Sequence, residues 1–306
     1  MRAGSNQRGV AVVLAMGMVA LATMAATAIV VTESTWTRRS ELGTDRVQAQ
    51  LVLKAGIDWA CAVLSEDRRT GAVDHPGEPW ALRLPPMPVD NGKLAGYLED
   101  QQGAFNLNNL VRDGKVVLTQ LTYFRRLLAL LELPADLADA LADWLDADSE
   151  PQGRGGAEDG YYLGLERPYL AANRPLVDVA ELALVRGFDA GVYARLRPFV
   201  AALPRRTAIN VNTASPEVLA AIARGLNLDG ARTLVARRQR AYFRDGPDFV
   251  GQLPAGATVG PDDIAVASAY FMATMRVTIG EAEAGGTALI AREDGKRPAV
   301  VWRKLP

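Results

Sequence analysis

The densest group of side chains that could do chemistry lies in the acidic segment DWLDADSEPQGRGGAED, residues 143–159. Its carboxylates are Asp143, Asp146, Asp148, Glu150, Glu158 and Asp159. Like charges at this density repel one another unless they spread into water or a cation neutralises them. Hard cations such as Ca²⁺ take about six to eight oxygen ligands from carboxylates and carbonyls on adaptable loops. Two interpretations therefore stay open on the residues alone: a calcium site and a solvated acidic loop.

Spacing inside the acidic segment favours some carboxylates as ligands. Asp146 and Asp148 alternate so that both side chains can reach one ion, and the Pro/Gly-rich loop after them can fold Glu158 and Asp159 back to join them. The order is not that of an EF-hand, because its central glycine and closing glutamate are missing. We predict the following ligands: Asp146, Asp148, Glu150, Glu158 and Asp159, with Asp178 as a remote one.

Composition argues against several other kinds of site. The 306 residues include one histidine, His75, and one cysteine, Cys61. Multi-histidine zinc sites and Ser-His-Asp or Cys-His catalytic groups are therefore nearly excluded, and an intramolecular disulfide cannot form. The formal net charge of -1 argues against a mainly electrostatic partner such as bulk nucleic acid. We predict a protein that is not an enzyme.

The region that must position the acidic segment is mostly helical, from residue 119 to about residue 266. Before it, residues 66–92 are rich in Pro, Gly and Asp and indicate loop, and the following residues up to 118 begin with a strand around Leu94–Leu98. After it, residues 267–306 give three short alternating runs with Gly-containing turns, typical of antiparallel strands. One strand before and three after predict an α+β domain with a large all-α domain inserted between its strands.

The N-terminus predicts a membrane-spanning helix that continues outward. Residues 10–32 carry no charge, enough at about 1.5 Å per residue to cross a hydrocarbon core of about 30 Å. Basic residues before this run place the N-terminus in the cytoplasm. The helix has no proline up to residue 65, and we predict one helix over residues 10–65. An apolar residue at every fourth position draws a stripe along its second half: Val47, Leu51, Ala55, Trp59 and Val63.

This N-terminus resembles that of type IV pilins and pseudopilins. A short basic leader, residues 1–9, ends in Gly9, and the apolar run begins at Val10. The resemblance implies that a prepilin peptidase cuts between Gly9 and Val10 and that the new N-terminus is methylated. Pilins carry Glu at the fifth mature position, where this chain has Leu14. Because a carboxylate in hydrocarbon persists only when paired, an apolar residue there suits a subunit with no neighbour above it, at the tip of a filament.

Four stretches of the chain together resemble the K-type minor pseudopilin of type II secretion systems. They are DQQGAFNLNNL, DWLDADSEP, GAEDGYYLGLERPYLAANRPLVDVAELALVRGF and INVNTASPEVLAAI. The resemblance covers essentially the whole chain. It implies a pilin-like head with an inserted helical domain that binds calcium, and a place at the pseudopilus tip with the I- and J-type minor pseudopilins. An inner-membrane secretion platform, a periplasmic head and a role in export of folded proteins across the outer membrane are implied as well.

An internal repeat leaves a second function open. Residues 174–196 and 209–238 each predict a polar cap, a short helix, a Gly-containing turn and a second helix. The second unit resembles the helix-hairpin-helix modules of DNA-binding competence proteins, with arginines at 232, 237, 238 and 240. However, Asp229 in its turn would repel a phosphate. A membrane-anchored DNA-binding component of a competence or type IV pilus system is therefore the alternative, and we expect nucleic-acid binding to be absent.

Overall fold

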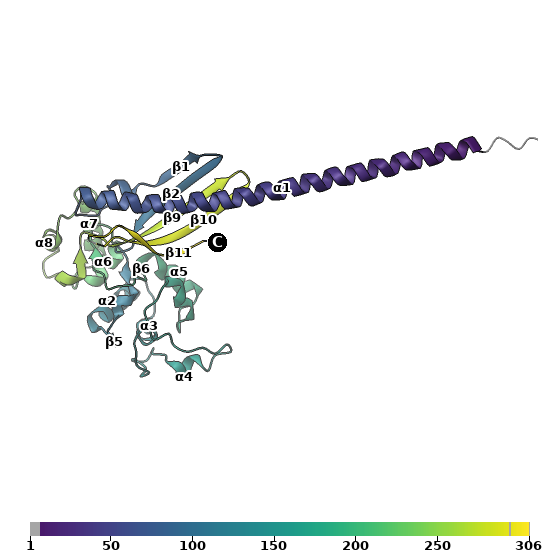
Figure 1. Ribbon diagram of the computed structural model, residues 1–306. Coiled ribbons are helices and arrows are strands. Elements are labelled where there is room, and N and C mark those ends of the chain that lie inside the picture. Colours follow the sequence, from purple (N-terminus) through teal and green to yellow (C-terminus); the bar gives the residue numbers. More distant parts are fainter. Residues whose placement is uncertain (1–6, 294, 306) are drawn as a thin grey trace, which may run out of the picture.

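A computed structural model describes residues 7–293 and 295–305 and shows a head on the end of one very long helix (Figure 1). Helix α1 (Gln7–Thr70) extends well beyond the rest of the molecule. By length and composition it can cross a membrane, and none of its most apolar part is buried within the described chain. Most of the predicted leader, residues 1–6, lies outside the described residues.

The head begins after α1 and contains the remaining elements. Its α-helices are α2 (Leu118–Leu130), α3 (Leu137–Leu145), α4 (Asp159–Tyr162), α5 (Ala190–Leu196), α6 (Pro216–Ile222), α7 (Leu228–Arg238) and α8 (Gly246–Val250). The 3₁₀ helices are η1 (Pro79–Ala81), η2 (Leu107–Leu110), η3 (Val179–Leu184), η4 (Arg197–Phe199) and η5 (Pro261–Asp263). The longer strands are β1 (Leu84–Val89), β2 (Gly92–Asp100), β9 (Tyr270–Ile279), β10 (Ala282–Ala291) and β11 (Ala299–Lys304). Two-residue strands are β3 (Phe105–Asn106), β4 (Val111–Arg112), β5 (Lys115–Val116), β6 (Val200–Ala201), β7 (Ile209–Asn210) and β8 (Ile264–Ala265).

One antiparallel sheet forms the part of the head next to α1. Its strand order is β1-β2-β9-β10-β11, so β2 and β9 are neighbours although about 170 residues separate them along the chain. The three predicted C-terminal strands are confirmed as β9, β10 and β11. Two strands precede the insertion, not the single one predicted: β1 lies in the stretch that we expected to be loop. The prolines in its sequence, LPPMPV, favour loop over strand. Proline is nevertheless tolerated in a strand at the edge of a sheet, and β1 is an edge strand.

The face of α1 that packs on the sheet differs from the predicted stripe. Its main buried apolar residues are Ala49, Leu53, Ile57, Ala60 and Leu64, and they form one core with the strands. Val47, Leu51 and Trp59 are instead exposed on the other side of α1. Small residues explain the choice: a Cβ at Gly56 would lie 3.3 Å from Leu94 Cδ1, so this face lets the helix approach closely. Of the stripe, Val63 is partly buried against this core, and the rest is left uncovered by the described chain.

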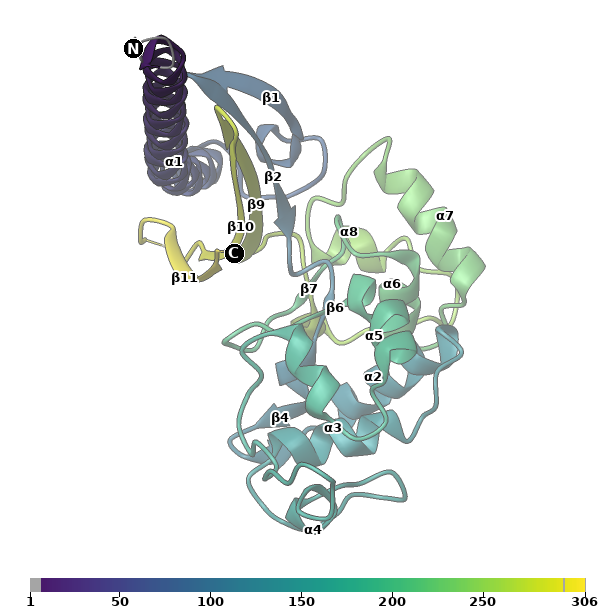
Figure 2. The same ribbon diagram turned by 90° about the vertical axis from the view of Figure 1, so that its right-hand side faces the viewer.

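The inserted domain is mostly helical and lies on the other side of the sheet from α1 (Figure 2). It has its own large hydrophobic core, which includes Phe105, Leu107 and Leu110. The insertion therefore begins soon after β2 and not at residue 119 as predicted. The inserted domain contacts the sheet through a small cluster in which Leu203 packs with Tyr270 and Leu289. Both predicted repeat units form: η3 and α5 flank a turn at Gly187, and α6 and α7 flank one at Gly225.

A buried polar network joins the inserted domain to the sheet. The Asp100 carboxylate, at the end of β2, accepts hydrogen bonds from Asn210 Nδ2 (2.9 Å), Ser268 Oγ (2.8 Å) and Thr213 Oγ1 (2.5 Å). Burial raises the pKa of Asp100, and these donors oppose that effect. Because Asp100 stands where the chain leaves the sheet and Ser268 where it returns, the network fixes both ends of the insertion.

Candidate metal centre

Helix α3 places the first predicted ligand. All its residues are buried, and it is followed by its C-cap residue Asp146, whose backbone N–H donates to Ala142 O at 2.9 Å. Asp146 has extended backbone angles, so the chain leaves the helix there. A carboxylate at a helix C-terminus meets the negative end of the helix dipole. The position therefore raises the energy of an ionised Asp146 and favours a nearby cation.

Glycines in the acidic segment let the loop fold back onto α3. The buried carboxylate of Asp143 accepts hydrogen bonds from the N–H groups of Gln152 (3.0 Å) and Ala157 (2.7 Å). A Cβ on Gly156 would lie 2.5 Å from Asp143 Oδ2, and one on Gly155 would lie 2.2 Å from Asp136 O. Only residues without a Cβ permit this close approach. Asp143 thus holds the loop, and the loop returns Glu158 to the end of α3.

Three carboxylates meet where the loop returns, and we call Asp146, Asp148 and Glu158 the loop triad. An oxygen from each lies within 4.8 Å of the others. The side chains of Asp146 and Glu158 are almost fully buried, with exposed fractions of 1% and 5%. Neither has a hydrogen-bond partner for either of its carboxylate oxygens. Burial, reinforced by the neighbouring carboxylates, raises the pKa of each to about 7.

The chemistry of the loop triad fits a calcium ion. Buried carboxylates without partners cost several kcal/mol unless a cation or a proton neutralises them. Three carboxylates offer up to six oxygens, which suits Ca²⁺ at about 2.3–2.6 Å with carbonyls or water filling the remaining positions. Mg²⁺ needs a tighter octahedral arrangement and keeps more of its water. Asp148 is exposed, so an ion can reach the triad from solvent.

The other predicted ligands lie outside the loop triad. Glu150 is exposed, and its N–H donates to Asp148 Oδ1 at 2.9 Å. Asp159 accepts a hydrogen bond from Ala171 N at 2.9 Å. Asp178 caps η3, where it accepts from Ala180 N, and forms an ion pair with Lys304 at 2.7 Å. The structure therefore brings together three of the six predicted residues.

One further oxygen near α3 was missed by sequence reasoning. Asn173 has a buried Oδ1 without a partner, and its N–H donates to Trp144 O at 3.0 Å, two residues before Asp146. Asn173 also has a positive φ of 45°, a conformation that asparagine tolerates better than most residues. Nothing in its local sequence distinguishes it from an ordinary loop asparagine.

A second group of carboxylates, the junction triad, lies where α1 ends. An oxygen from each of Asp67, Asp74 and Glu78 lies within 4.8 Å of the others. Here an arginine supplies the cation: Arg292 Nη1 lies 2.6 Å from Asp67 Oδ2, and Nη2 lies 2.5 Å from Asp74 Oδ2. Arg292, Asp67 and Asp74 are all buried. Burial and Glu78 raise the pKa of Asp67 to about 6 while Arg292 opposes them, so Asp67 is ionised at neutral pH.

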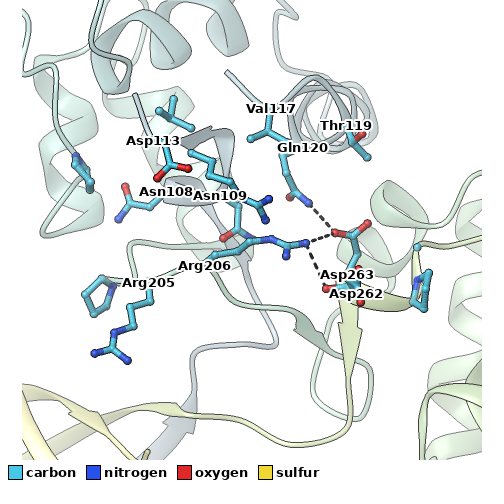
Figure 3. Close-up of a pocket in the computed structure, with 16 residues that line it drawn as sticks. Asn108, Asn109, Asp113, Val117, Thr119, Gln120, Arg205, Arg206, Asp262 and Asp263 are labelled. Atoms are coloured by element: carbon cyan, nitrogen blue, oxygen red, sulfur yellow. Dashed lines mark hydrogen bonds and ion pairs between the residues drawn. The ribbon is translucent and has the colours of Figure 1, made fainter. Parts of the chain in front are cut away.

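A cavity of about 550 Å³ opens between η2, the start of α2 and η5 (Figure 3). One of its carboxylates, Asp263, already has several partners. Asp263 accepts hydrogen bonds from Gln120 Nε2 at 2.8 Å and Tyr123 OH at 3.0 Å, and Arg206 Nη2 lies 3.3 Å from its Oδ1. These contacts tie η5 to α2, so the carboxylate serves packing of the domain.

The arginines of the second repeat unit are partly used inside the chain. Arg238 donates to Val211 O at 2.7 Å, and burial lowers its pKa to about 10. Arg232 forms an ion pair with Asp229 at 3.0 Å within the same helix. Two of the four arginines are therefore occupied, and Asp229, which we expected in the turn, lies in the first turn of α7 instead.

The comparisons with known proteins point to one and the same family. Two family models described as type II secretion system (T2SS), protein K, match residues 103–205 and 209–269. A type II secretion system protein K from Pseudomonas aeruginosa is 40% identical, covering 97% of this chain and 92% of the relative. One from Klebsiella pneumoniae is 32% identical and covers 98% and 96%. A chain in the crystal structure of the GspK-GspI-GspJ complex from enterotoxigenic Escherichia coli has a TM-score of 0.77 and 30% identity, covering 88% of this chain and 99% of that one.

Proposed function

Because the chain belongs to the type II secretion system protein K family, we propose that it forms the tip of a secretion pseudopilus and supports export of folded proteins. It is a minor pseudopilin of a type II secretion system. Leu14 supports the tip position. In a tip subunit, a carboxylate at this position would lie in the membrane with no subunit above it to pair with, so an apolar residue is favoured. The broad inserted domain at the end of the head away from the apolar part of α1 (Figure 1) fits a cap better than a subunit that others stack upon.

The observation that carries this proposal is the exposed apolar stripe on α1. Val47, Leu51 and Trp59 lie on the side of α1 that the sheet leaves free, and Leu51 is 63% exposed. Exposed apolar residues in a row on one helix face indicate a partner helix. The similar solved structure is a complex with GspI and GspJ, so we propose that I- and J-type minor pseudopilins cover this stripe.

Co-purification from detergent-solubilised membranes tests the partner surface. Leu51→Glu places a charge in the stripe and should abolish recovery of the I- and J-type subunits with the full chain. Leu118→Glu is the matched control, because Leu118 is also strongly exposed (75%) but lies at the start of α2. Equal recovery with both variants, or equal loss, would reject the stripe as the interface.

Processing and orientation follow from the same proposal. We propose cleavage by a prepilin peptidase between Gly9 and Val10, with a methylated N-terminus, a single pass through the inner membrane and a periplasmic head that engages the secretion platform. A Cβ on Gly9 would meet no atom within 4 Å, so packing within the described chain does not require glycine there. The requirement then comes from the peptidase. Gly9→Leu should leave the leader attached, as mass spectrometry of the membrane fraction would show, and normal cleavage of this variant would contradict the proposal.

We also propose that the loop triad binds calcium. Its residues Asp146 and Glu158 hold the ion from the end of α3 and from the start of α4, while Asp148 closes it from the solvent side. A bound ion supplies the positive charge that these buried carboxylates lack. Its role is structural: it joins the acidic segment to the helix and so fixes one end of the inserted domain.

A further inference from the structure

The face of the sheet away from α1 contains a trough of about 720 Å³. The residues that define this sheet trough are Arg83, Ala95, Tyr97, Arg276, Gly285 and Lys304. They come from β2, β9, β10, β11 and the residue before β1. The inserted domain covers the same face only farther along, around Tyr270 and Leu289.

Small residues make the floor of the trough low. Ala95 and Gly285 are the cross-strand partners of Arg276 on its two sides, so the arginine lies between two residues with almost no side chain. Farther along, Thr274 pairs with Tyr97 and with Thr287. The guanidinium of Arg276 is exposed above this floor.

Gly285 is not explained by packing within the chain. A Cβ there would meet only Met275 O, at an ordinary 3.6 Å, and its backbone is not in the left-handed region. By contrast, a Cβ on Gly96 would lie 2.2 Å from Met275 Sδ, and one on Gly286 would lie 2.7 Å from Leu305 Cδ2. Glycine weakens a strand interior and often marks a place where another backbone comes close. Gly285 therefore keeps space open on the outside of the sheet.

The walls of the trough are cationic. Arg276 has no ion pair in the described part of the chain. Arg83 stacks on Tyr97, 4.3 Å from the ring centre, and its link to Glu99 is long at 3.5 Å. Arginine and tyrosine are enriched in protein interfaces, and arginine binds carboxylates through two parallel hydrogen bonds.

We propose that the sheet trough binds an extended acidic segment of a partner protein. A carboxylate of that segment pairs with Arg276, and its backbone passes over Gly285. Charge complementarity selects this occupant, because Arg276 presents a guanidinium group without an ion pair in the described part of the chain, while Arg83 and Lys304 are paired with Glu99 and Asp178. The trough lies on the opposite side of the sheet from α1, so its use does not depend on the exposed apolar stripe of the proposed function.

A fluorescent peptide tests the trough directly. The probe is a short fluorescein-labelled peptide that alternates aspartate with serine, and its matched control alternates asparagine with serine. Both are titrated into the detergent-solubilised full chain and followed by fluorescence anisotropy. We expect binding of the acidic peptide only. No binding at millimolar peptide, or equal binding of both peptides, would overturn the proposal.

Two variants separate the trough from general surface charge. Arg276→Gln should weaken binding by about tenfold or more, the effect of losing a charge-assisted hydrogen bond. Arg303→Gln is the control. Arg303 is exposed, and its cross-strand neighbour is Ala288, so it lies on the other face of the sheet. It should change the affinity by less than about twofold, as expected for a distant, screened charge. Equal losses in the two variants would reject a specific site.

Gly285→Val distinguishes a binding role from a structural one. Valine suits a strand better than glycine, so the thermal midpoint should stay the same or rise. Its side chain would fill the floor of the trough, so peptide binding should be lost. A variant that binds as tightly as the original chain would overturn the proposal. Leu51→Glu should leave peptide binding intact, so failure of the apolar stripe as an interface and failure of the trough give different results.

Discussion

The loop triad and the junction triad contain similar carboxylates at similar distances, yet they are completed in different ways. At the junction triad, Arg292 reaches across from the end of β10 and pairs with Asp67 and Asp74. At the loop triad, the oxygens of Asp146 and Glu158 have no partner from the described chain. A group of buried acids therefore indicates an external ion only where the fold supplies no cation of its own. We expect the junction triad to need no metal and the loop triad to need one.

The largest expected effect is the loss of the internal cation. Arg292→Met removes the charge and leaves two buried carboxylates, which should destabilise the full chain by about 3–5 kcal/mol. Thermal and denaturant unfolding followed by circular dichroism in detergent would measure it. Arg303→Met, at an exposed arginine, should cost under about 1 kcal/mol. A small effect of Arg292→Met would mean that the junction triad is not held by its arginine.

The loop triad should make the chelator-treated protein sensitive to pH. The pKa values of Asp146 and Glu158 are about 7 in the folded state, against about 4 for unfolded carboxyls. The folded state therefore holds extra protons between these values, and the free energy of unfolding falls as pH rises from about 4 to about 7. The fall is on the order of 4 kcal/mol for one carboxyl whose pKa changes by about 3 units, and the two neighbouring carboxyls titrate as a coupled pair. Well above pH 7 both carboxylates are ionised in the folded state, and the free energy of unfolding falls no further.

Calcium should flatten that pH dependence, because the ion keeps both carboxylates ionised. The contribution of Asp67, whose pKa is about 6, should remain in both conditions because Arg292 is always present. Unfolding curves at several pH values, with chelator and with calcium, give the comparison. Identical pH profiles in both conditions would contradict a cation at the loop triad.

The smallest expected effect is at Asp178, the predicted remote ligand. Asp178→Asn removes a partly exposed ion pair with Lys304 and should cost under about 1 kcal/mol. Its midpoint shift with calcium should equal that of the original chain, since Asp178 lies outside the loop triad. Loss of the calcium response in this variant would restore Asp178 as a ligand and would require the loop to move.

Parts of the fold and of the loop triad could be predicted from the sequence, because their sequence patterns are local. The apolar run of α1, the alternating strands at the C-terminus and the acidic segment each show their pattern within a few tens of residues. The glycines at 153, 155 and 156 also suggested a loop that can fold back. Local spacing predicts that Asp146 and Asp148 lie close together, and the structure places both in the loop triad. The fold-back of the loop predicts the same for Glu158 and Asp159, but only Glu158 joins them.

Other features depend on contacts between distant residues. Both sides of α1 are apolar, so periodicity alone cannot decide which one the sheet covers; the small residues Ala49, Gly56 and Ala60 decide it through close approach. Arg292 meets Asp67 across 225 positions, and no local pattern reveals such a pair. Asp178 looked like a ligand in sequence, but its N-cap role and Lys304 occupy it in the fold.

Calcium titration of the chelator-treated full chain by isothermal calorimetry tests most directly whether the loop triad needs an external ion. The original chain should bind calcium, and Glu158→Gln should abolish the binding heat. Glu78→Gln, the equivalent change in the junction triad, should leave that heat unchanged, and magnesium should bind much more weakly than calcium. No calcium binding by the original chain, or the same heat in Glu158→Gln, would contradict the loop triad as the metal centre.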